Sequence, residues 1–393
     1  MMTPDVRGLP ALTPTFEREA DVVVVGAGAA GLSAALAAAS GGRRVLLLCK
    51  GLLGTGATAL AQGGLAAVLD PDDTFDQHAT DTLVAGAGLA DPSMVRDLVA
   101  DAPAEIARLL GLGAVLDADP RSSHGLALAR EGGHRRARVV HAGGDASGAE
   151  VDRTLVSAVL GSGAEVLECV IALDALTDAS GRVVGLSVAR VDPTGRLIPG
   201  VVRARAVVLA TGGLGQAWAT TTNPSGATGD GLGLALRAGA ELRSLEFVQF
   251  HPTVLWSGPG ARGRQTLVSE AVRGEGAVLV DASGHRIMAD VHPMGDLAPR
   301  DVVAVAMHRR MCDATQGETT HLYLDATGLG RDVLAHRFPS MLATGSRYRV
   351  HVELAEAKPL GESGVEVVWR LTYEVEGQPK PCCVADLVFR YYS

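Results

Sequence analysis

The stretch Asp21–Ser40, which reads DVVVVGAGAAGLSAALAAAS, decides the fold. Its first part, Val22–Val25, is a continuous apolar run of the kind found in parallel strands that are buried on both faces. Its last part is rich in Ala and Leu, which favour a helix. Gly26, Gly28 and Gly31 lie between the two parts with GxGxxG spacing. A strand, a glycine turn and a helix in this order predict a Rossmann-like nucleotide-binding unit in an α/β protein.

Each glycine has a different task in such a unit. Gly26 permits the tight turn, Gly28 lets the backbone approach a pyrophosphate, and Gly31 lets the helix pack close to the strand. The N-terminus of the helix offers free N–H groups and a positive dipole end to the phosphates. Because a glycine-rich turn of this spacing also occurs in other α/β proteins, the nucleotide site needs support from the rest of the chain.

The next strand departs from the dinucleotide pattern. Arg44–Leu48 is apolar and ends in Cys49 and Lys50, where an acidic residue would normally bind the ribose. A glycine-rich segment, Gly51–Val68, follows directly. A second buried strand, Arg205–Leu209, again runs into glycines, which bring the backbone close to a ligand.

The composition favours a globular protein in a reducing compartment. The 393 residues suffice for two or three domains, and the net charge of −9 does not favour nucleic acid or an anionic membrane as a partner. The five cysteines are scattered and form no CxxC pair, so we expect no disulfide framework and no metal site. The N-terminal segment has no apolar core, and we expect no signal peptide. A cytoplasmic location follows.

Seven segments together resemble the flavoprotein subunit family of succinate dehydrogenase, fumarate reductase and L-aspartate oxidase. They occur in the family's order between about residues 18 and 344 and read VVVVGAGAAGLSAAL, ALAQGG, VVLATGG, NPSGATGDGLGLALRAGAEL, EFVQFHPT, SEAVRGEGAVLVD and DLAPRDVVA. The resemblance implies FAD as the cofactor. It assigns cofactor contacts to Gly26, Gly28, Ala29, Ala30, Gly31, Lys50, Thr58, Gln62, Gly63, Gly64, Ala210, Thr211, Gly212, Gly213 and Asp230, the last at the expected start of a helix.

Within that family the chain is most similar to the L-aspartate oxidases. Ala57 stands where the succinate enzymes carry a histidine bonded to flavin, which implies noncovalent FAD. The resemblance implies oxidation of L-aspartate to iminoaspartate, with hydride passing from Cα to flavin N5 and oxygen or fumarate as the acceptor. This is the first step of quinolinate and NAD synthesis, with a hand-off to quinolinate synthase. The alternative is a soluble fumarate reductase or succinate oxidase.

The same resemblance identifies the residues that act on the substrate. It assigns catalytic roles to Arg300, His251 and Glu131, and substrate contacts to Gln249, Ser269 and Glu270. Glu131 would face the substrate's amino group, whereas Arg300 and His251 would bind carboxylates.

Each of these assignments has a plainer alternative. His251 could be a satisfied core histidine, and Arg300 could only pair with Asp301 at a helix start. Glu131 could be a solvated loop acid. Arg273 and Glu275 could only pair with each other.

We expect four parts in the chain: an N-terminal tail (1–17), an FAD-binding domain (18–243), an α+β capping domain (244–344) and an appended antiparallel β segment (345–393). The last part alternates apolar and polar residues and is similar to the end of a MaoC-like hot-dog domain. It lacks that family's catalytic segment, so no hydratase activity is implied. Because the flavoprotein family's final segment is not recognisable here, we expect weak FAD binding. An inactive fusion or truncation product remains a third reading.

Overall fold

The computed structural model describes residues 13–256, 258, 260–313 and 321–339, and the backbone of residues 348–359, 364–375 and 383–392. The chain divides into two compact units, Met1–Phe338 and Pro339–Ser393. Within the N-terminal tail, residues 1–12 lie outside the described residues, as does the expected boundary at 344/345.

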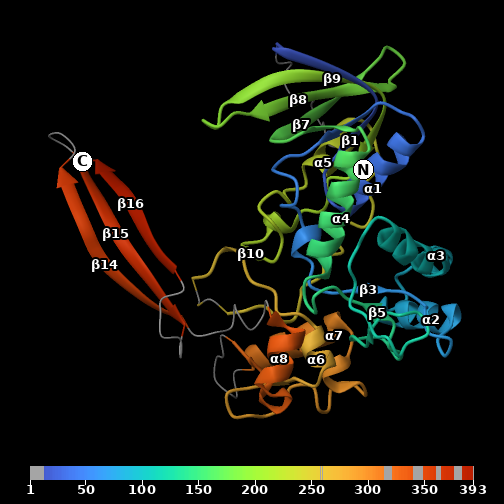
Figure 1. The fold of residues 1–393 in the computed structure, drawn as a ribbon, viewed down its shortest axis with the longest axis vertical. Helices are drawn as coiled ribbons and strands as arrows, with labels where there is room; N and C mark the ends of the chain where they lie inside the picture. The colour runs from blue at the N-terminus through green and yellow to red at the C-terminus, as the bar shows by residue number, and fades with distance from the viewer. Residues whose placement is uncertain are drawn as a thin grey trace. The chain divides into compact units, whose positions relative to one another are not determined.

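The first unit is built on a six-stranded sheet in the order β6-β2-β1-β9-β8-β7 (Figure 1). Strands β6, β2, β1 and β9 are parallel, whereas β8 is antiparallel to both β9 and β7. The bounds are β1 Phe16–Val25, β2 Val45–Leu48, β6 Glu165–Leu167, β7 Val170–Thr177, β8 Val183–Val191 and β9 Leu197–Leu209. The valine run predicted as a buried parallel strand is therefore the end of a central strand, between β2 and β9.

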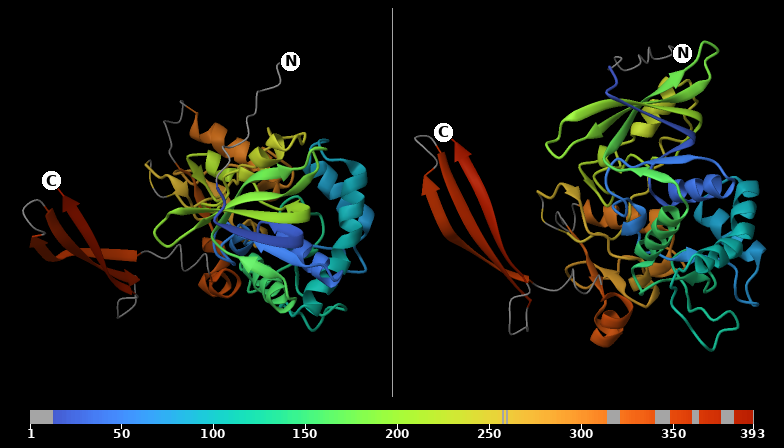
Figure 2. Two further views of the ribbon diagram at one scale, coloured as in Figure 1. Left: turned by 90° about the horizontal axis from the view of Figure 1, so that it is seen from above. Right: turned by 45° about the horizontal axis from the view of Figure 1, so that its top comes forward.

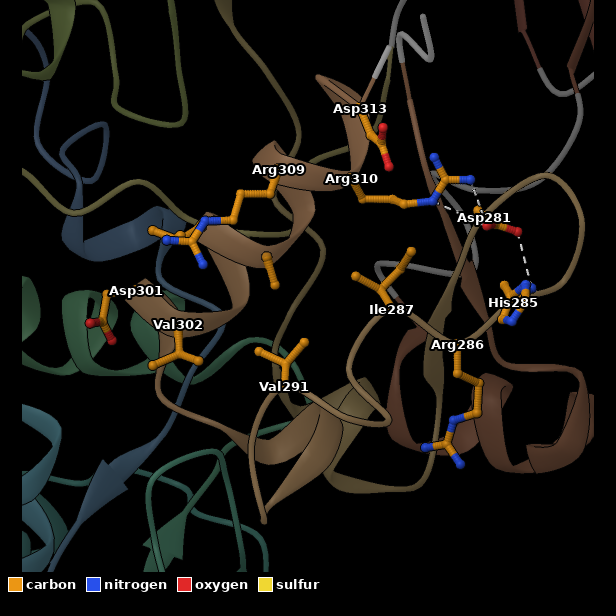
Figure 3. Close-up of a pocket in the computed structure, with 12 residues that line it drawn as sticks. Asp281, His285, Arg286, Ile287, Val291, Asp301, Val302, Arg309, Arg310 and Asp313 are labelled. Carbon is orange, nitrogen blue, oxygen red and sulfur yellow. Dashed lines mark hydrogen bonds and ion pairs between the residues drawn. The ribbon is translucent and has the colours of Figure 1, made fainter. Parts of the chain in front are cut away.

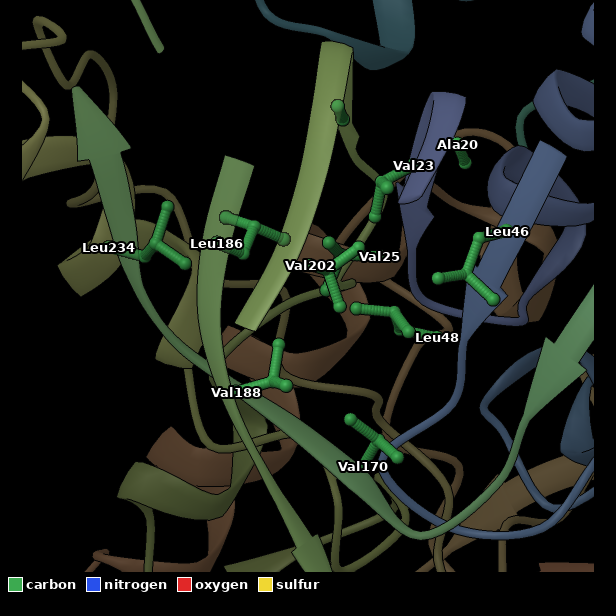
Figure 4. Close-up of a cluster of buried hydrophobic side chains, with 11 residues drawn as sticks. Ala20, Val23, Val25, Leu46, Leu48, Val170, Leu186, Val188, Val202 and Leu234 are labelled. Carbon is green, nitrogen blue, oxygen red and sulfur yellow. The ribbon is translucent and has the colours of Figure 1, made fainter. Parts of the chain in front are cut away.

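Both faces of this sheet are buried. Val23 and Val25 of β1 point to one face, where they pack with residues of β2, β7, β8 and β9 and with Leu234 of α5 (Asp230–Arg237) (Figure 4). Val24 points to the other face and packs with Leu32 of α1 (Ala29–Ser40). Because successive side chains of a strand alternate, a run that is apolar at every position covers both faces.

Helices cover the second face of the sheet. This core contains residues of α1, of α3 (Pro92–Gly111) and of α4 (Ser147–Gly161). The helix α2 (Phe75–Ala85) packs on α3. Nearby, three short strands form a sheet in the order β3-β5-β4, with bounds Leu65–Ala66, Val139–Val140 and Leu128–Ala129.

The capping part of the first unit lies away from the six-stranded sheet (Figures 1 and 2). It contains α6 (Ala271–Gly274), β12 (Val278–Val280), α7 (Arg300–Met311), β13 (Tyr323–Asp325) and α8 (Arg331–Arg337). Strands β12 and β13 are antiparallel. The parallel pair β10 (Thr220–Thr221) and β11 (Gly263–Arg264) belongs to the connecting segments.

The second unit is a three-stranded antiparallel sheet in the order β14-β15-β16. Its strands are Tyr348–Pro359, Gly364–Val375 and Cys383–Tyr392, in agreement with the alternation seen in the sequence. Among the residues that the structure describes, no helix has both the length and the apolar character needed to cross a bilayer.

Candidate active site

The glycine turn after β1 is as tight as its sequence predicts. Gly26 has a φ of 110°, and a Cβ built there would lie 2.2 Å from the carbonyl oxygen of Ala210. A Cβ on Gly31 would lie 1.8 Å from the carbonyl oxygen of Gly26. Any side chain at these two positions would therefore push β1, α1 and the end of β9 apart.

The start of α1 is left open toward solvent, with one backbone contact supplied from another segment. The hydroxyl of Thr58 accepts a hydrogen bond of 2.9 Å from the backbone N–H of Ala29. The N-cap residue, Gly28, has no side chain, and the first turn of the helix carries no acid, so no negative charge of the helix neutralises its positive end. The geometry suits an anionic group placed beside Gly28 and Ala29.

Lys50, directly after β2, supplies a cation at the same edge of the sheet. Its ammonium lies 2.5 Å from a carboxylate oxygen of Asp230 and 2.6 Å from the hydroxyl of Thr228. Burial raises the pKa of the Asp230 carboxyl, but the hydrogen bonds from Lys50 and Thr228 outweigh that effect and lower it. Lys50 and Asp230 border a cavity of about 70 Å³ that Gly26 and Thr211 also line.

These residues fit FAD. Gly212 and Gly213 follow β9 at the carboxyl ends of the parallel strands, and a Cβ built on either would meet nothing within 4 Å. The backbone there is open to a ligand, as at the first glycine turn. The side-chain oxygen Oε1 of Gln62 is buried without a hydrogen-bond partner, so this segment presents an unused acceptor. Open glycine backbone, a cation and an orphaned acceptor are groups that a dinucleotide can satisfy.

Arg300 lies at the centre of a second, charged cluster. Its Nε donates to the Glu270 carboxylate, and its Nη1 donates to Oε1 of Gln249 at 3.1 Å. Glu270 is 3% exposed, and its other oxygen lies 3.4 Å from Nη2 of Arg273, whose side chain is fully buried. Burial, followed by the charge of Arg300, lowers the pKa of Arg273, although Glu270 opposes this. Arg300 therefore pairs with Glu270 and Gln249 from other segments, so its contacts are not confined to its own helix.

Two of the plainer alternatives are wrong. Arg273 does not pair with Glu275, because Arg273 faces Glu270 and Glu275 binds Arg337 at 2.6 Å. Glu131 is not a solvated loop acid, since it is 8% exposed and lies 2.9 Å from Nε2 of His141.

The charge of Glu131 is set by its neighbours. Burial raises its pKa, but the hydrogen bond and charge of His141, together with Arg300, outweigh burial and lower it. Glu131 is therefore ionised at neutral pH. Its second oxygen, Oε2, faces Gly63, where a built Cβ would lie 3.9 Å away. The structure thus places this carboxylate between the Gln62–Gly64 segment and the Arg300 cluster.

His251 is partly buried beside the same cluster. Burial, with the charges of Arg300 and Arg273 adding to it, lowers its pKa to about 4, so the imidazole is neutral near pH 7. Nδ1 lies 2.9 Å from the carbonyl oxygen of Thr253. His251 and Gln249 line a cavity of about 190 Å³ with Asn223 and Gln265. The alternative of a satisfied core histidine does not account for a ring that borders a cavity.

Ser269 completes the set of predicted substrate residues. It is 2% exposed, and its hydroxyl accepts a hydrogen bond of 3.3 Å from the backbone N–H of Ala271 at the start of α6. Here Ser269 helps to fix the turn that carries Glu270. Its substrate contact stays a prediction.

Beneath Glu131 lies a buried ionic network that the sequence did not reveal. The side chain of Arg138 is fully buried and binds Asp73 at 2.7 Å and Asp81 at 2.6 Å. Its Nη1 also lies 3.0 Å from Nδ1 of His134. Burial, followed by the charges of Arg138 and His134, lowers the pKa of His78 to about 4. Asp73 and Asp81 are far from Arg138 in sequence, and no spacing rule connects them.

A broad hollow of about 710 Å³ lies elsewhere, on the capping part (Figure 3). Two of its charged lining residues, Asp281 and Arg310, pair with each other. Asp281 accepts from Nη2 of Arg310 at 2.8 Å and from the backbone N–H of His285 at 3.0 Å. None of the predicted site residues lines this hollow. The Arg300 cluster, where buried charges converge, is therefore the stronger candidate for the active site.

The sequence also matches a known protein family. Residues 21–359 match the family described as FAD binding domain, so the match ends beyond the limit near residue 344 that we expected. The chain is 53% identical over 335 residues to the L-aspartate oxidase of Streptomyces coelicolor, covering 85% of this chain and 57% of that protein. It is 50% identical over 333 residues to the L-aspartate oxidase of Mycobacterium tuberculosis, covering 84% and 60%.

Solved structures show the same architecture. The E. coli quinol fumarate reductase FrdA superposes with a TM-score of 0.75 at 33% identity, covering 84% of this chain and 57% of that chain. The Mycobacterium smegmatis Sdh1 complex gives a TM-score of 0.66 at 33% identity, covering 84% and 56%. The chain spans somewhat more than half the length of these relatives. From its glycine turns to its charged cluster, the chain belongs to the FAD-binding domain family.

Proposed function

We propose that this chain oxidises L-aspartate to iminoaspartate with noncovalently bound FAD. The observation that carries the proposal is the buried, ionised Glu131, whose free oxygen faces Gly63 close to the Arg300 cluster. A dicarboxylate that lacks an amine carries no positive charge that could pair with Glu131, a second buried carboxylate beside Glu270. An amino dicarboxylate does, because its ammonium can pair with Glu131. Relatives that share 44% to 53% identity are L-aspartate oxidases.

The residues divide the work of binding. Arg300 presents a planar fork to one carboxylate of the substrate. His251 and Gln249, which border the adjoining cavity, contact the same diacid. Glu131 orients the α-amino group, and the fixed positions of these side chains present Cα in one orientation. When bound, FAD would supply the two-electron acceptor for the hydride from Cα, and the α-ammonium would pass one proton to Glu131, the carboxylate beside it, so that the imine can form.

Arg300 is also one end of a line of paired charges. It binds Glu270, and Glu270 faces Arg273 at 3.4 Å as an ion pair without a hydrogen bond. An arginine has a reference pKa above about 12, so we assign Arg300 to carboxylate binding before proton transfer. Ala57, which precedes Thr58, offers no nucleophile, and this supports a noncovalent cofactor.

The wider setting follows from the same proposal. Oxygen or fumarate accepts the electrons, the product enters quinolinate synthesis with a hand-off to quinolinate synthase, and the reaction takes place in the cytoplasm. For the second unit, we propose only an appended antiparallel β segment akin to the end of a hot-dog domain, with no activity of its own.

A second candidate is a fumarate reductase. It is favoured by the Arg300–Glu270–Arg273 chain, which needs no amine in the ligand, and by the likeness to quinol fumarate reductase FrdA. The carboxylate of Glu131 distinguishes the two candidates, since only an amino substrate gains from it.

An aspartate-dependent peroxide assay with added FAD tests the proposal. We expect peroxide from the unmodified chain and a loss of about 100-fold in Glu131→Gln, while fumarate reduction is retained. Glu275→Gln is the matched control, because Glu275 pairs with Arg337 outside the cluster. Fumarate reduction without any aspartate oxidation in the unmodified chain would favour the second candidate and overturn the first.

A further inference from the structure

The partner of Glu131 is a histidine to which the sequence assigned no role. His141 directly follows β5 (Val139–Val140) and is 5% exposed. Its Nε2 lies 2.9 Å from Oε1 of Glu131. Two ionisable side chains that are 6% and 11% exposed are in direct contact here, beside the proposed substrate site.

The direction of this hydrogen bond follows from charge. Glu131 is ionised, and an ionised carboxylate can only accept. Nε2 of His141 must therefore carry a hydrogen and donate it. The opposite tautomer would place a bare nitrogen lone pair against a buried anion, which is strongly unfavourable.

The bond also decides which carboxylate oxygen is free. Oε1 is engaged by His141, whereas Oε2 is turned to Gly63. The loop that carries Glu131 is fixed from the capping side, because the backbone N–H of Gly133 donates to the carbonyl of Leu297 at 3.1 Å. A Cβ on Gly132 would lie 1.9 Å from Oε1 of Glu270, so this loop and the Arg300 cluster are packed together. These contacts fix the loop, and Oε2 of Glu131 therefore points toward Gly63.

We propose that His141 is a positioning residue for amine recognition: by donating Nε2–H to Oε1 of Glu131, it keeps that carboxylate ionised and aims Oε2 at the ammonium of an α-amino dicarboxylate. The inference rests on the proposed function and adds to it the residue that makes the site selective for an amine. Without the donor, burial favours the protonated carboxyl, which offers the ammonium no charge. Binding of a dicarboxylate that lacks an amine does not depend on His141.

Calorimetric titration of the FAD-supplied chain with L-aspartate and with succinate tests the role. In His141→Leu, the Kd for L-aspartate rises at least about tenfold, as for a lost charge-assisted hydrogen bond, and the Kd for succinate changes less than about twofold. His141→Gln places an amide donor near the position of Nε2 and restores aspartate binding to within about threefold. Equal losses for both ligands, or no rescue by Gln, would overturn the proposal.

A second readout needs neither turnover nor a variant. The ¹⁵N chemical shifts of the His141 ring in the unmodified chain report which nitrogen carries hydrogen. We expect Nε2–H; a ring protonated on Nδ1 alone, with bare Nε2, would contradict the inference. Failure of the proposed function would look different, as binding of succinate without any binding of L-aspartate by the unmodified chain, and it would remove this inference as well.

Discussion

At the scale of single residues, Arg300 is fixed by what it touches. Glu270 holds one edge of its guanidinium and Gln249 holds another, so the plane of the fork is set before a ligand arrives. Glu270 in turn faces Arg273, and the two fully or nearly buried side chains balance charge. Side chains that are already ordered lose little conformational entropy when a ligand binds, so this preorganised charge favours binding.

Replacing Arg300 by Lys removes the planar guanidinium and keeps the positive charge, so it tests whether the shape of the group matters. We expect kcat/KM for L-aspartate to fall by about 100-fold or more, because an ammonium cannot bind Glu270, Gln249 and a carboxylate in one plane. Steady-state kinetics measure this. Arg309→Lys, on the exposed side of the same helix, is the control, and equal activity of Arg300→Lys and the unmodified chain would contradict the assignment.

His251 predicts a pH dependence of ligand binding. Nδ1 lies 2.9 Å from the carbonyl oxygen of Thr253 and 3.2 Å from its backbone nitrogen, so only the protonated ring can donate to that carbonyl and, from Nε2, to a carboxylate at the same time. We expect a carboxylate ligand to select this form, and because the pKa is about 4 in the free chain, a proton is then taken up on binding. Succinate should therefore bind more tightly as the pH falls from about 8 to about 6, by up to tenfold per pH unit. Calorimetry in buffers of different ionisation enthalpy measures the proton uptake; an undiminished slope in His251→Asn would refute this role.

At the scale of elements, we expect substitutions at different glycines to affect different properties: the stability of the fold at Gly31 and the binding of FAD at Gly213. Gly31 packs α1 against the turn at Gly26, whereas Gly213 borders open space. Gly31→Ala should cost at least about 1–3 kcal/mol of unfolding free energy, because the methyl group meets a backbone oxygen. Gly213→Ala should leave the stability of the FAD-free chain unchanged and weaken FAD binding. Chemical denaturation and flavin fluorescence measure the two effects, and equal stability losses in both variants would contradict the distinction.

The buried network under the Glu131 loop should stabilise the fold. Arg138→Met leaves Asp73 and Asp81 buried without their cation, for which we expect a loss of about 3–5 kcal/mol in unfolding free energy. Arg153→Met is the control, because the Arg153 side chain is 54% exposed and its pair with Glu150 is open to solvent on that side, so we expect a loss of about 1 kcal/mol or less. Denaturation that is the same in the two variants would show that the network adds no stability.

Much of this element-scale picture follows from local patterns. The valine run, the glycine turn and the helix start at Asp230 are decided within a few residues, so the sequence predicts them. The pairing of His141 with Glu131, and of Arg138 with Asp73, is decided by how separate elements pack. No short-range rule contains that information. The sequence shows His141 ten residues after Glu131, but this spacing does not indicate where the imidazole points.

At the scale of the whole molecule, two sites share one unit. The carboxyl ends of the parallel strands carry the glycine turns and Lys50, and the capping part contributes Arg300, Glu270 and His251. Both belong to Met1–Phe338, and the second unit is a separate antiparallel sheet. The predicted cofactor residues and the predicted substrate residues therefore both lie in the part of the chain that matches the FAD-binding domain family.

Anaerobic titration of the FAD-saturated chain with L-aspartate, followed by the visible absorbance of the flavin, tests this account most directly. We predict bleaching by L-aspartate in the unmodified chain and none, or bleaching at least about 100-fold slower, in Glu131→Gln. Bound flavin that L-aspartate leaves fully coloured in the unmodified chain would contradict the account.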